Sequence, residues 1–125
     1  MEGKLQLLEI DINDLAVDDR GVIYSFVPKD PIVEFCYQYT NKGATRGFHY
    51  HEEFDEYVML VDGEWIYNEY LYDKRTRKIV MGAGQTIYIP RLTPHSFVAI
   101  SDCKSVSFLT KKWNDCAKAI TKQQE

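Results

Sequence analysis

The chain has 125 residues, a formal net charge of −4 and an isoelectric point near 5.4. A chain of this length buries one hydrophobic core, so we expect a single domain over residues 1–125. The acidic balance argues against binding to nucleic acid, which depends on clustered lysine and arginine. No run of about 18 apolar residues and no apolar signal core is present, which argues against a membrane span and predicts a cytoplasmic protein.

Short segments rich in tyrosine, valine, isoleucine and phenylalanine alternate with turn residues along most of the chain, a pattern typical of strands. Edge strands are possible at Leu5 to Ile10 and at Val22 to Phe26. The strands expected after them are Ile32–Thr40, Arg46–His51, Glu56–Val61, Glu64–Tyr72, Lys78–Met81, Thr86–Pro90, Ser96–Ile100 and Ser105–Thr110. Short strands at this regular spacing predict an all-β fold, either a sandwich or a barrel.

Only the end of the chain departs from the strand pattern. Between Lys112 and Lys122 a helix would place the less polar residues on one side: Trp113, Cys116, Ala117 and Ile120. We therefore expect a short C-terminal helix that caps or flanks the barrel.

The chain has three histidines, and two of them form an HxH pair at His49 and His51. On a strand both rings point to one face, because side chains alternate with a period of two. Glu56 begins the next expected strand and can face the pair, and His95 follows a later strand. Such a set suits a divalent transition metal (Fe, Mn, Ni, Co or Zn) with positions open to water or substrate. The alternative is a metal-free group of hydrogen-bonded acids and bases.

The histidine pair lies in a longer motif. Gly43, His49, His51, Glu56 and Gly63 fill every specified position of the first cupin motif, G-x5-H-x-H-x4-E-x6-G. The chain thus resembles the cupin superfamily. This resemblance implies a double-stranded β-helix, the jelly-roll barrel, with its core at about residues 24–110 and with the motif side chains inside it.

The second cupin motif is only partly matched. Gly84, Pro90 and His95 occupy their usual positions, whereas Leu92 stands in place of a glycine and Ala99 in place of an asparagine. Neither departure affects a ligand position. The resemblance therefore implies a metal held by His49, His51, Glu56 and His95.

One stretch of the sequence resembles two particular families within the cupin superfamily. The segment from Lys42 to Tyr50 is similar to the KGVLRGLHY segment of dTDP-4-dehydrorhamnose 3,5-epimerases, and Arg46 to His51 is similar to the RGxHAH segment of dTDP-4-keto-6-deoxyhexose 3,4-ketoisomerases. This likeness implies that His49 is a general base and that Arg46 holds a nucleotide phosphate. The epimerases carry a catalytic tyrosine after the last strand, where this chain has none, and the ketoisomerases lack Glu56 and work without metal.

Two expectations concern the lining of the pocket. Strict alternation turns Arg46 away from the face of His49, so Arg46 reaches the site only through a β-bulge or a position at the mouth of the barrel. Among the many strand tyrosines, Tyr37 and Tyr88 are expected to contact the substrate.

These observations favour an isomerase or epimerase of a nucleotide-linked keto-sugar, with His49 and His51 as catalytic residues. A metal-dependent dioxygenase or lyase acting on a small polar acid is the main alternative, and a non-catalytic sugar or nucleotide-binding protein is the third. Family resemblance and the need to cover exposed strand edges predict a homodimer.

Overall fold

The computed structural model describes residues 7–8, 12–71 and 74–122. Nearly all its regular structure is β, as the sequence predicts. The strands are β1 (Leu7–Leu8), β2 (Ile12–Asp18), β3 (Gly21–Phe26), β4 (Glu34–Thr40), β5 (Thr45–Tyr50), β6 (Glu56–Asp62), β7 (Glu64–Leu71), β8 (Lys74–Gly82), β9 (Thr86–Ile89), β10 (His95–Ala99), β11 (Cys103–Leu109) and β12 (Thr121–Lys122). None of these residues belongs to a helix that could cross a membrane.

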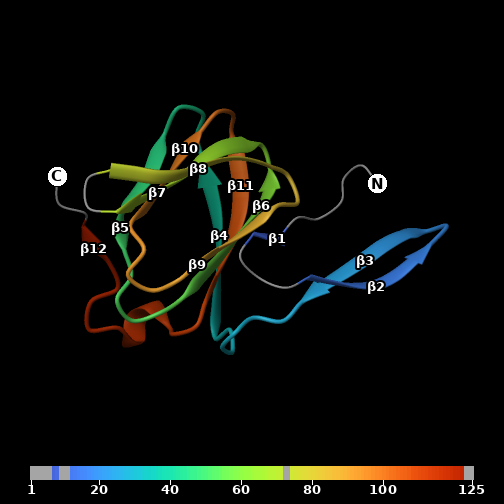
Figure 1. Ribbon diagram of the computed structural model, residues 1–125, viewed down its shortest axis with the longest axis horizontal. Coiled ribbons are helices and arrows are strands. Elements are labelled where there is room, and N and C mark those ends of the chain that lie inside the picture. Colours follow the sequence, from blue (N-terminus) through green and yellow to red (C-terminus); the bar gives the residue numbers. More distant parts are fainter. Residues whose placement is uncertain (1–6, 9–11, 72–73, 123–125) are drawn as a thin grey trace.

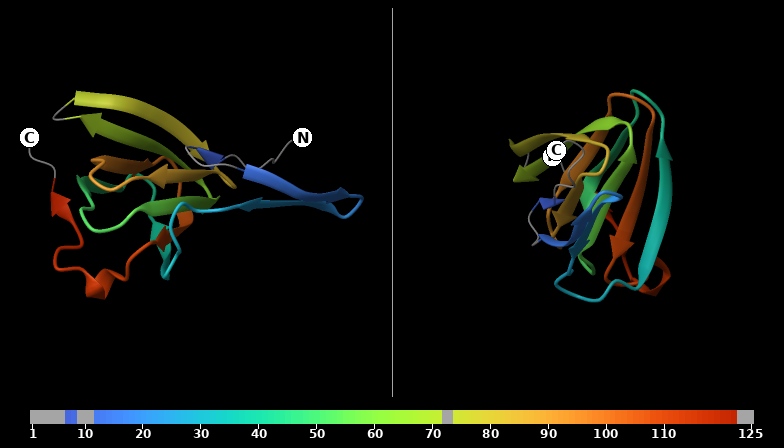
Figure 2. Two further views of the ribbon diagram at one scale, coloured as in Figure 1. Left: turned by 60° about the horizontal axis from the view of Figure 1, so that its bottom comes forward. Right: turned by 90° about the vertical axis from the view of Figure 1, so that its right-hand side faces the viewer.

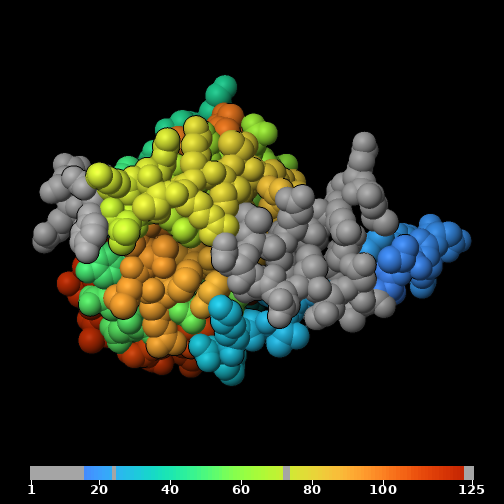
Figure 3. Space-filling view, viewed as in Figure 1, coloured from blue at the N-terminus to red at the C-terminus, as the bar shows by residue number. Residues whose placement is uncertain are grey.

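Two five-stranded sheets form the body of the molecule (Figure 1). One has the strand order β1-β9-β6-β11-β4 and the other the order β12-β5-β10-β7-β8. The hairpin of β2 and β3 is a separate two-stranded sheet that extends from one end of the body (Figures 2 and 3). This architecture agrees with the double-stranded β-helix implied by the cupin motifs.

The apolar core fills one part of the space between the two sheets. Its side chains come from six strands, because every second residue on each strand points inward. The core residues are Val58, Leu60, Trp65, Tyr67, Met81, Ile87, Ile89, Phe97, Ala99 and Cys103. The remaining part of the interior is left for polar groups.

The expected strands are found, with small shifts at their ends. The largest change is at β8, which begins at Lys74 rather than at Lys78. Strands β2 and β12 are additional. The possible first strand, Leu5 to Ile10, lies mostly outside the described residues, and only β1 falls within it.

The expected C-terminal helix is wrong. After β11 the chain makes a 3-10 turn at Trp113–Asp115, and β12 then pairs antiparallel with β5, with Thr121 opposite Tyr50. A helix of about eleven residues is marginal by itself, so packing decides its conformation. Here strand pairing and bonds to side chains of the barrel hold the segment in an extended form.

Strand β5 contains a β-bulge beside the histidine pair. His49 lies opposite His95, yet the next residue of β10, Ser96, lies opposite Gly47, so Phe48 is the extra residue. Phe48 has a φ of 57° and Gly47 a φ of 108°, both in the left-handed region. The bulge shifts the alternation by one residue, so that Arg46 and His49 both line the interior.

Gly47 has a second reason to be glycine, which gives a testable prediction. A Cβ at this position would lie 2.5 Å from the carbonyl oxygen of His95 and 2.8 Å from the Cα of Ser96. We expect Gly47→Ala to lower the free energy of unfolding in urea by about 3 kcal/mol, from backbone strain plus the steric clash.

Gly43→Ala is the matched control. Its φ is also positive, at 85°, but a Cβ there would meet no atom within 4 Å. It should therefore cost only about 1 kcal/mol. Equal losses for the two variants would contradict the tight approach of β5 to β10.

Candidate functional site

A cavity of about 310 Å³ lies between the two sheets, next to the apolar core. Its lining combines strand residues from both sheets with one residue of the C-terminal segment. The lining residues are Gln38, Thr45, Arg46, Gly47, His49, His51, Glu56, Trp65, His95, Phe97, Ser107 and Trp113. All four residues proposed as metal ligands are among them.

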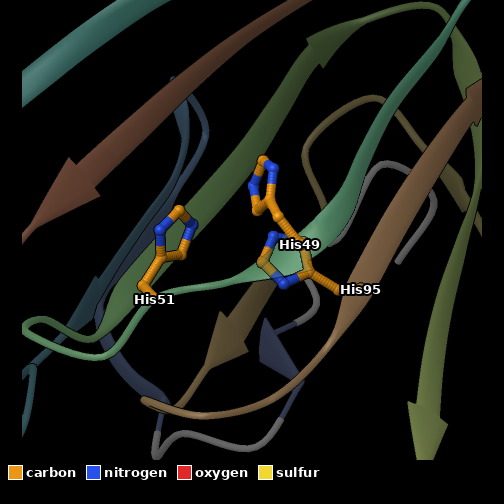
Figure 4. A group of neighbouring side chains, drawn as sticks. All are labelled: His49, His51 and His95. Carbon is orange, nitrogen blue, oxygen red and sulfur yellow. The ribbon is translucent and has the colours of Figure 1, made fainter. Parts of the chain in front are cut away.

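The three histidines line this cavity, and Figure 4 shows their rings grouped together. Their ring centroids lie 4.8 Å apart for His49 and His51, 5.0 Å for His49 and His95, and 5.3 Å for His51 and His95. One nitrogen from each ring can be chosen so that all three lie within 4.8 Å of one another. Residues 46 positions apart are joined because β5 and β10 are neighbours in one sheet.

Backbone carbonyls orient two of the rings. The Nδ1–H of His51 donates to the carbonyl of Ala119 at 2.9 Å, and the Nδ1–H of His95 donates to the carbonyl of Thr93 at 2.9 Å. A carbonyl oxygen can only accept, so each Nδ1 carries the proton, and each Nε2 has a lone pair when the ring is neutral.

Glu56 lies against these two Nε2 atoms. Its Oε1 is 3.2 Å from Nε2 of His51 and 3.8 Å from Nε2 of His95. The Nε2 of His51 is buried, and apart from this contact with Glu56 it has no hydrogen-bond partner among the described residues. A buried nitrogen that lacks a partner is a position where a ligand can be gained.

Burial and neighbouring charge move the pKa values of these groups apart. Burial, with the nearby His95 and His51 rings, lowers the pKa of His49 to about 4. Burial also lowers the pKa of His51, but Glu56 outweighs it and sets that pKa above the usual 6.5. For Glu56, burial raises the pKa, whereas the His51 and His95 rings lower it more, so the carboxylate stays ionised.

These four residues fit a divalent transition metal. Histidines that bind metals through one ring nitrogen typically donate the other N–H to a carbonyl or carboxylate, as His51 and His95 do here. An ionised carboxylate lies beside both free nitrogens, and His49 supplies a third imidazole. Nitrogen and oxygen donors of this kind suit Fe, Mn, Co, Ni or Zn.

Arg46 lines the cavity through the bulge in β5. Its Nε donates to the Thr40 hydroxyl at 2.8 Å, and one terminal nitrogen donates to the Tyr39 carbonyl at 2.7 Å. These bonds use only two of the five guanidinium donors. Arg46 is the one lysine or arginine among the lining residues, so a ligand with an anionic group finds its charge partner there.

The structure does not bring the two expected tyrosines to the cavity. Tyr37 points to the outer face of β4 and is 54% exposed, next to the ring of Tyr39. Tyr88 is buried on β9 against Tyr57, at a centroid distance of 4.9 Å. Which face of its strand a tyrosine occupies depends on register, and composition alone does not report it.

Three polar lining residues were not expected from the sequence: Gln38, Thr45 and Ser107. The side-chain oxygen of Gln38 accepts hydrogen bonds from Ser105 at 3.1 Å and Ser107 at 3.2 Å, across the pair β4–β11. Strand alternation offered a signal for Ser107, because Ser105 and Ser107 lie two residues apart on the buried face of β11. Trp113, which lies in the C-terminal segment, gave no such signal.

The site geometry predicts separate titration of the three histidines in the metal-free protein. In NMR spectra His49 should titrate near pH 4 and His51 above pH 6.5. The pKa of His49 is about 4 in the folded chain, below its value of 6.5 in the unfolded chain. Between these two pH values the unfolded chain binds the proton more readily, so the fold loses stability as the pH drops from 6.5 to about 4. His51 has the opposite effect, stabilising the fold at low pH. Three coincident midpoints near 6.5 would contradict this cluster.

Comparisons with known proteins agree with the fold. Among solved structures, the chain is similar to a 3,4-ketoisomerase from Helicobacter canadensis, with a TM-score of 0.73, 15% identity and coverage of 91% of this chain and 90% of that one. It is also similar to QdtA, a sugar 3,4-ketoisomerase from Thermoanaerobacterium thermosaccharolyticum in complex with TDP, with a TM-score of 0.66, 18% identity and coverage of 85% and 81%.

A third similar structure is the capsular polysaccharide assembling protein CapF from Staphylococcus aureus, with a TM-score of 0.63 and 17% identity. The match covers 92% of this chain but 33% of CapF, so the chain spans about a third of that protein's length. A search of curated proteins gave no match. The model of the cupin domain family matches residues 37–110, more than half of the chain. The chain therefore belongs to the cupin family.

Proposed function

We propose that this cupin is an isomerase or epimerase that moves a proton next to the carbonyl of a nucleotide-linked keto-sugar. The observation that carries the proposal is the pairing of two histidines with opposite pKa shifts in one cavity. Groups whose pKa values are pushed apart can act as base and acid in the same reaction. Two of the similar structures are 3,4-ketoisomerases, one of them in complex with TDP, which supports the substrate class.

In this proposal His49 is the base. It lines the cavity and is neutral at physiological pH, so it can accept the proton from the carbon next to the carbonyl. A base with so low a pKa is weak. The reaction therefore depends on stabilising the negative charge that develops on the carbonyl oxygen.

His51 supplies that stabilisation. Its pKa is raised by Glu56, so it is more often protonated than an ordinary histidine, and its Nε2–H can donate to the carbonyl oxygen. The electron pair of the broken C–H bond forms the enediol, and the oxygen takes the proton of His51. His49 then returns its proton to the former carbonyl carbon while His51 accepts the proton of the other enediol hydroxyl, whose carbon becomes the new carbonyl, and both histidines are regenerated.

Arg46 is the proposed partner of the nucleotide phosphates. Its guanidinium has donors left after its bonds to Thr40 and Tyr39, and it is itself exposed. A cavity of about 310 Å³ is at the small end of the range for ligand pockets. It suits the sugar ring, while the phosphates and base lie outside along Arg46.

A metal would be held by His51, Glu56 and His95, with His49 completing the set. When bound, it would supply Lewis-acid stabilisation of a substrate oxygen. A histidine cannot coordinate a metal and exchange a proton with the same nitrogen. A metal held through His51 would therefore replace His51 in stabilising the carbonyl oxygen, and a four-ligand site would also exclude His49 as the base.

The second candidate function is a metal-dependent dioxygenase or lyase acting on a small polar acid. The observation that favours it is the full set of three imidazoles and one carboxylate around a small cavity, with Arg46 as the one cation to hold an acid. A homodimer and a cytoplasmic location stay predictions.

The first test of the proposal follows hydrogen exchange in D2O. With dTDP-4-keto-6-deoxyglucose as the probe, the parent protein should incorporate deuterium next to the ketone, as monitored by NMR. His49→Asn should slow the exchange about 100-fold to 10,000-fold, because the base is lost. Exchange at the parent rate in a folded His49→Asn protein would contradict the role of His49, and no exchange with the parent would contradict the substrate class.

The second test measures the metal content of the purified, untagged protein by elemental analysis. We expect a near-stoichiometric divalent transition metal in the parent and none in the His51→Ala, Glu56→Ala double variant, which loses two ligands. Iron would favour the oxygenase, and zinc, nickel or manganese a Lewis-acid isomerase or lyase. A metal-free parent grown with added metals would contradict the metal site and leave the acid–base mechanism.

A further inference from the structure

The C-terminal segment, residues 111–122, borders the cavity although it lies outside the cupin motifs. It leaves β11, passes along the edge of the body and ends beside β5 (Figures 1 and 2). Trp113 lines the cavity, with its ring 6.3 Å from that of His51 and 6.1 Å from that of Phe54. The segment therefore forms part of the wall.

Carboxylates of the barrel hold this segment. Glu53 binds it twice, accepting from Nζ of Lys111 at 2.9 Å and from the backbone N–H of Lys118 at 2.7 Å. Glu52 accepts from the hydroxyl of Thr121 at 2.5 Å. The two bonds of Glu53 enclose the residues between Lys111 and Lys118, and Glu34 accepts a further bond within them, from the backbone N–H of Trp113 at 2.7 Å.

The segment in turn holds a histidine of the site. The carbonyl of Ala119, next to Lys118, accepts the Nδ1–H of His51 at 2.9 Å. This is the only hydrogen bond of the His51 ring within the described part of the chain. In a neutral imidazole a hydrogen bond of this kind selects which nitrogen carries the proton. The Ala119 carbonyl thus favours the proton on Nδ1, in competition with the Glu56 carboxylate, which lies 3.2 Å from Nε2 and favours the proton there.

We infer that Glu53 is a positioning residue of the site, which acts through the C-terminal segment and the Ala119 carbonyl to fix the tautomer and direction of His51. The inference rests on the proposed role of His51 as a ligand or an acid. Loss of such an outer partner typically lowers metal affinity about 10-fold to 100-fold. No part of the cupin motifs specifies this residue, because it works through a segment beyond the last barrel strand.

The test compares Glu53→Ala with the parent in the metal-free protein labelled with nitrogen-15, at a pH where the imidazoles are neutral. Long-range proton–nitrogen spectra identify the protonated nitrogen of each ring. In the parent, His51 should be the Nδ1–H form. In Glu53→Ala its signals should move toward a mixture of both tautomers, whereas His95, which is bound to the Thr93 carbonyl, should keep the Nδ1–H form.

Co²⁺ titration of the same proteins is the second measurement. We expect Glu53→Ala to weaken Co²⁺ binding about 10-fold or more. Glu64→Ala is the matched control, since Glu64 is an exposed glutamate on β7, away from the cavity lining, and it should change neither measurement. If Glu53→Ala fails to fold, as judged by circular dichroism, Lys111→Met removes one of the two bonds more gently and should shift both measurements in the same direction.

An Nδ1–H tautomer retained by His51 in folded Glu53→Ala, with Co²⁺ affinity within about 2-fold of the parent, would overturn the inference. So would a parent protein in which His51 carries its proton on Nε2. The tautomer measurement needs neither metal nor substrate. If the parent protein did not turn over the sugar nucleotide, but its His51 tautomer still changed in Glu53→Ala, the result would therefore count against the proposed function and not against this inference.

Discussion

The site depends on the burial of one carboxylate among three imidazoles. A buried carboxylate alone would gain a proton, since burial disfavours its charged form. Here the His51 and His95 rings keep Glu56 ionised, and Glu56 in turn keeps a proton on His51 more readily. The charge of Glu56 and the charge of His51 therefore depend on each other. The result is a cavity that can hold a metal cation or exchange protons with a bound molecule, and both possibilities arise from the same electrostatic coupling.

Two residues near these groups hold a left-handed backbone conformation, one in the bulge of β5 and one in the turn before β10. Phe48 adopts a left-handed conformation in the bulge of β5, where its side chain is 49% exposed. Leu92, which stands where the family has a glycine, also has a positive φ of 68° and is 64% exposed. Both side chains extend away from the core, so the cost is mostly conformational. Residues held in such rare conformations gather at functional sites, where the surrounding structure maintains them.

The division of the interior also follows from the two sheets. Strands β6 and β10 each contribute apolar residues to the core and a polar residue to the cavity, and Trp65 of β7 belongs to both. The apolar part provides stability and keeps the site residues in place. The C-terminal segment adds a further wall and reaches His51 from outside the barrel. A motif confined to the barrel strands therefore describes only part of the site.

The sequence by itself determined the all-β class, most strands and the family, because strand alternation and motif spacing are local properties of the chain. It also named the four residues that gather at the cavity. Only the tertiary structure decided that the bulge brings Arg46 inward, since a bulge arises from the pairing of β5 with β10. The same holds for the outward direction of Tyr37, which register decides, and for the extended C-terminal segment. There, bonds to Glu52 and Glu53 from residues more than 50 positions away outweigh a weak local preference for helix.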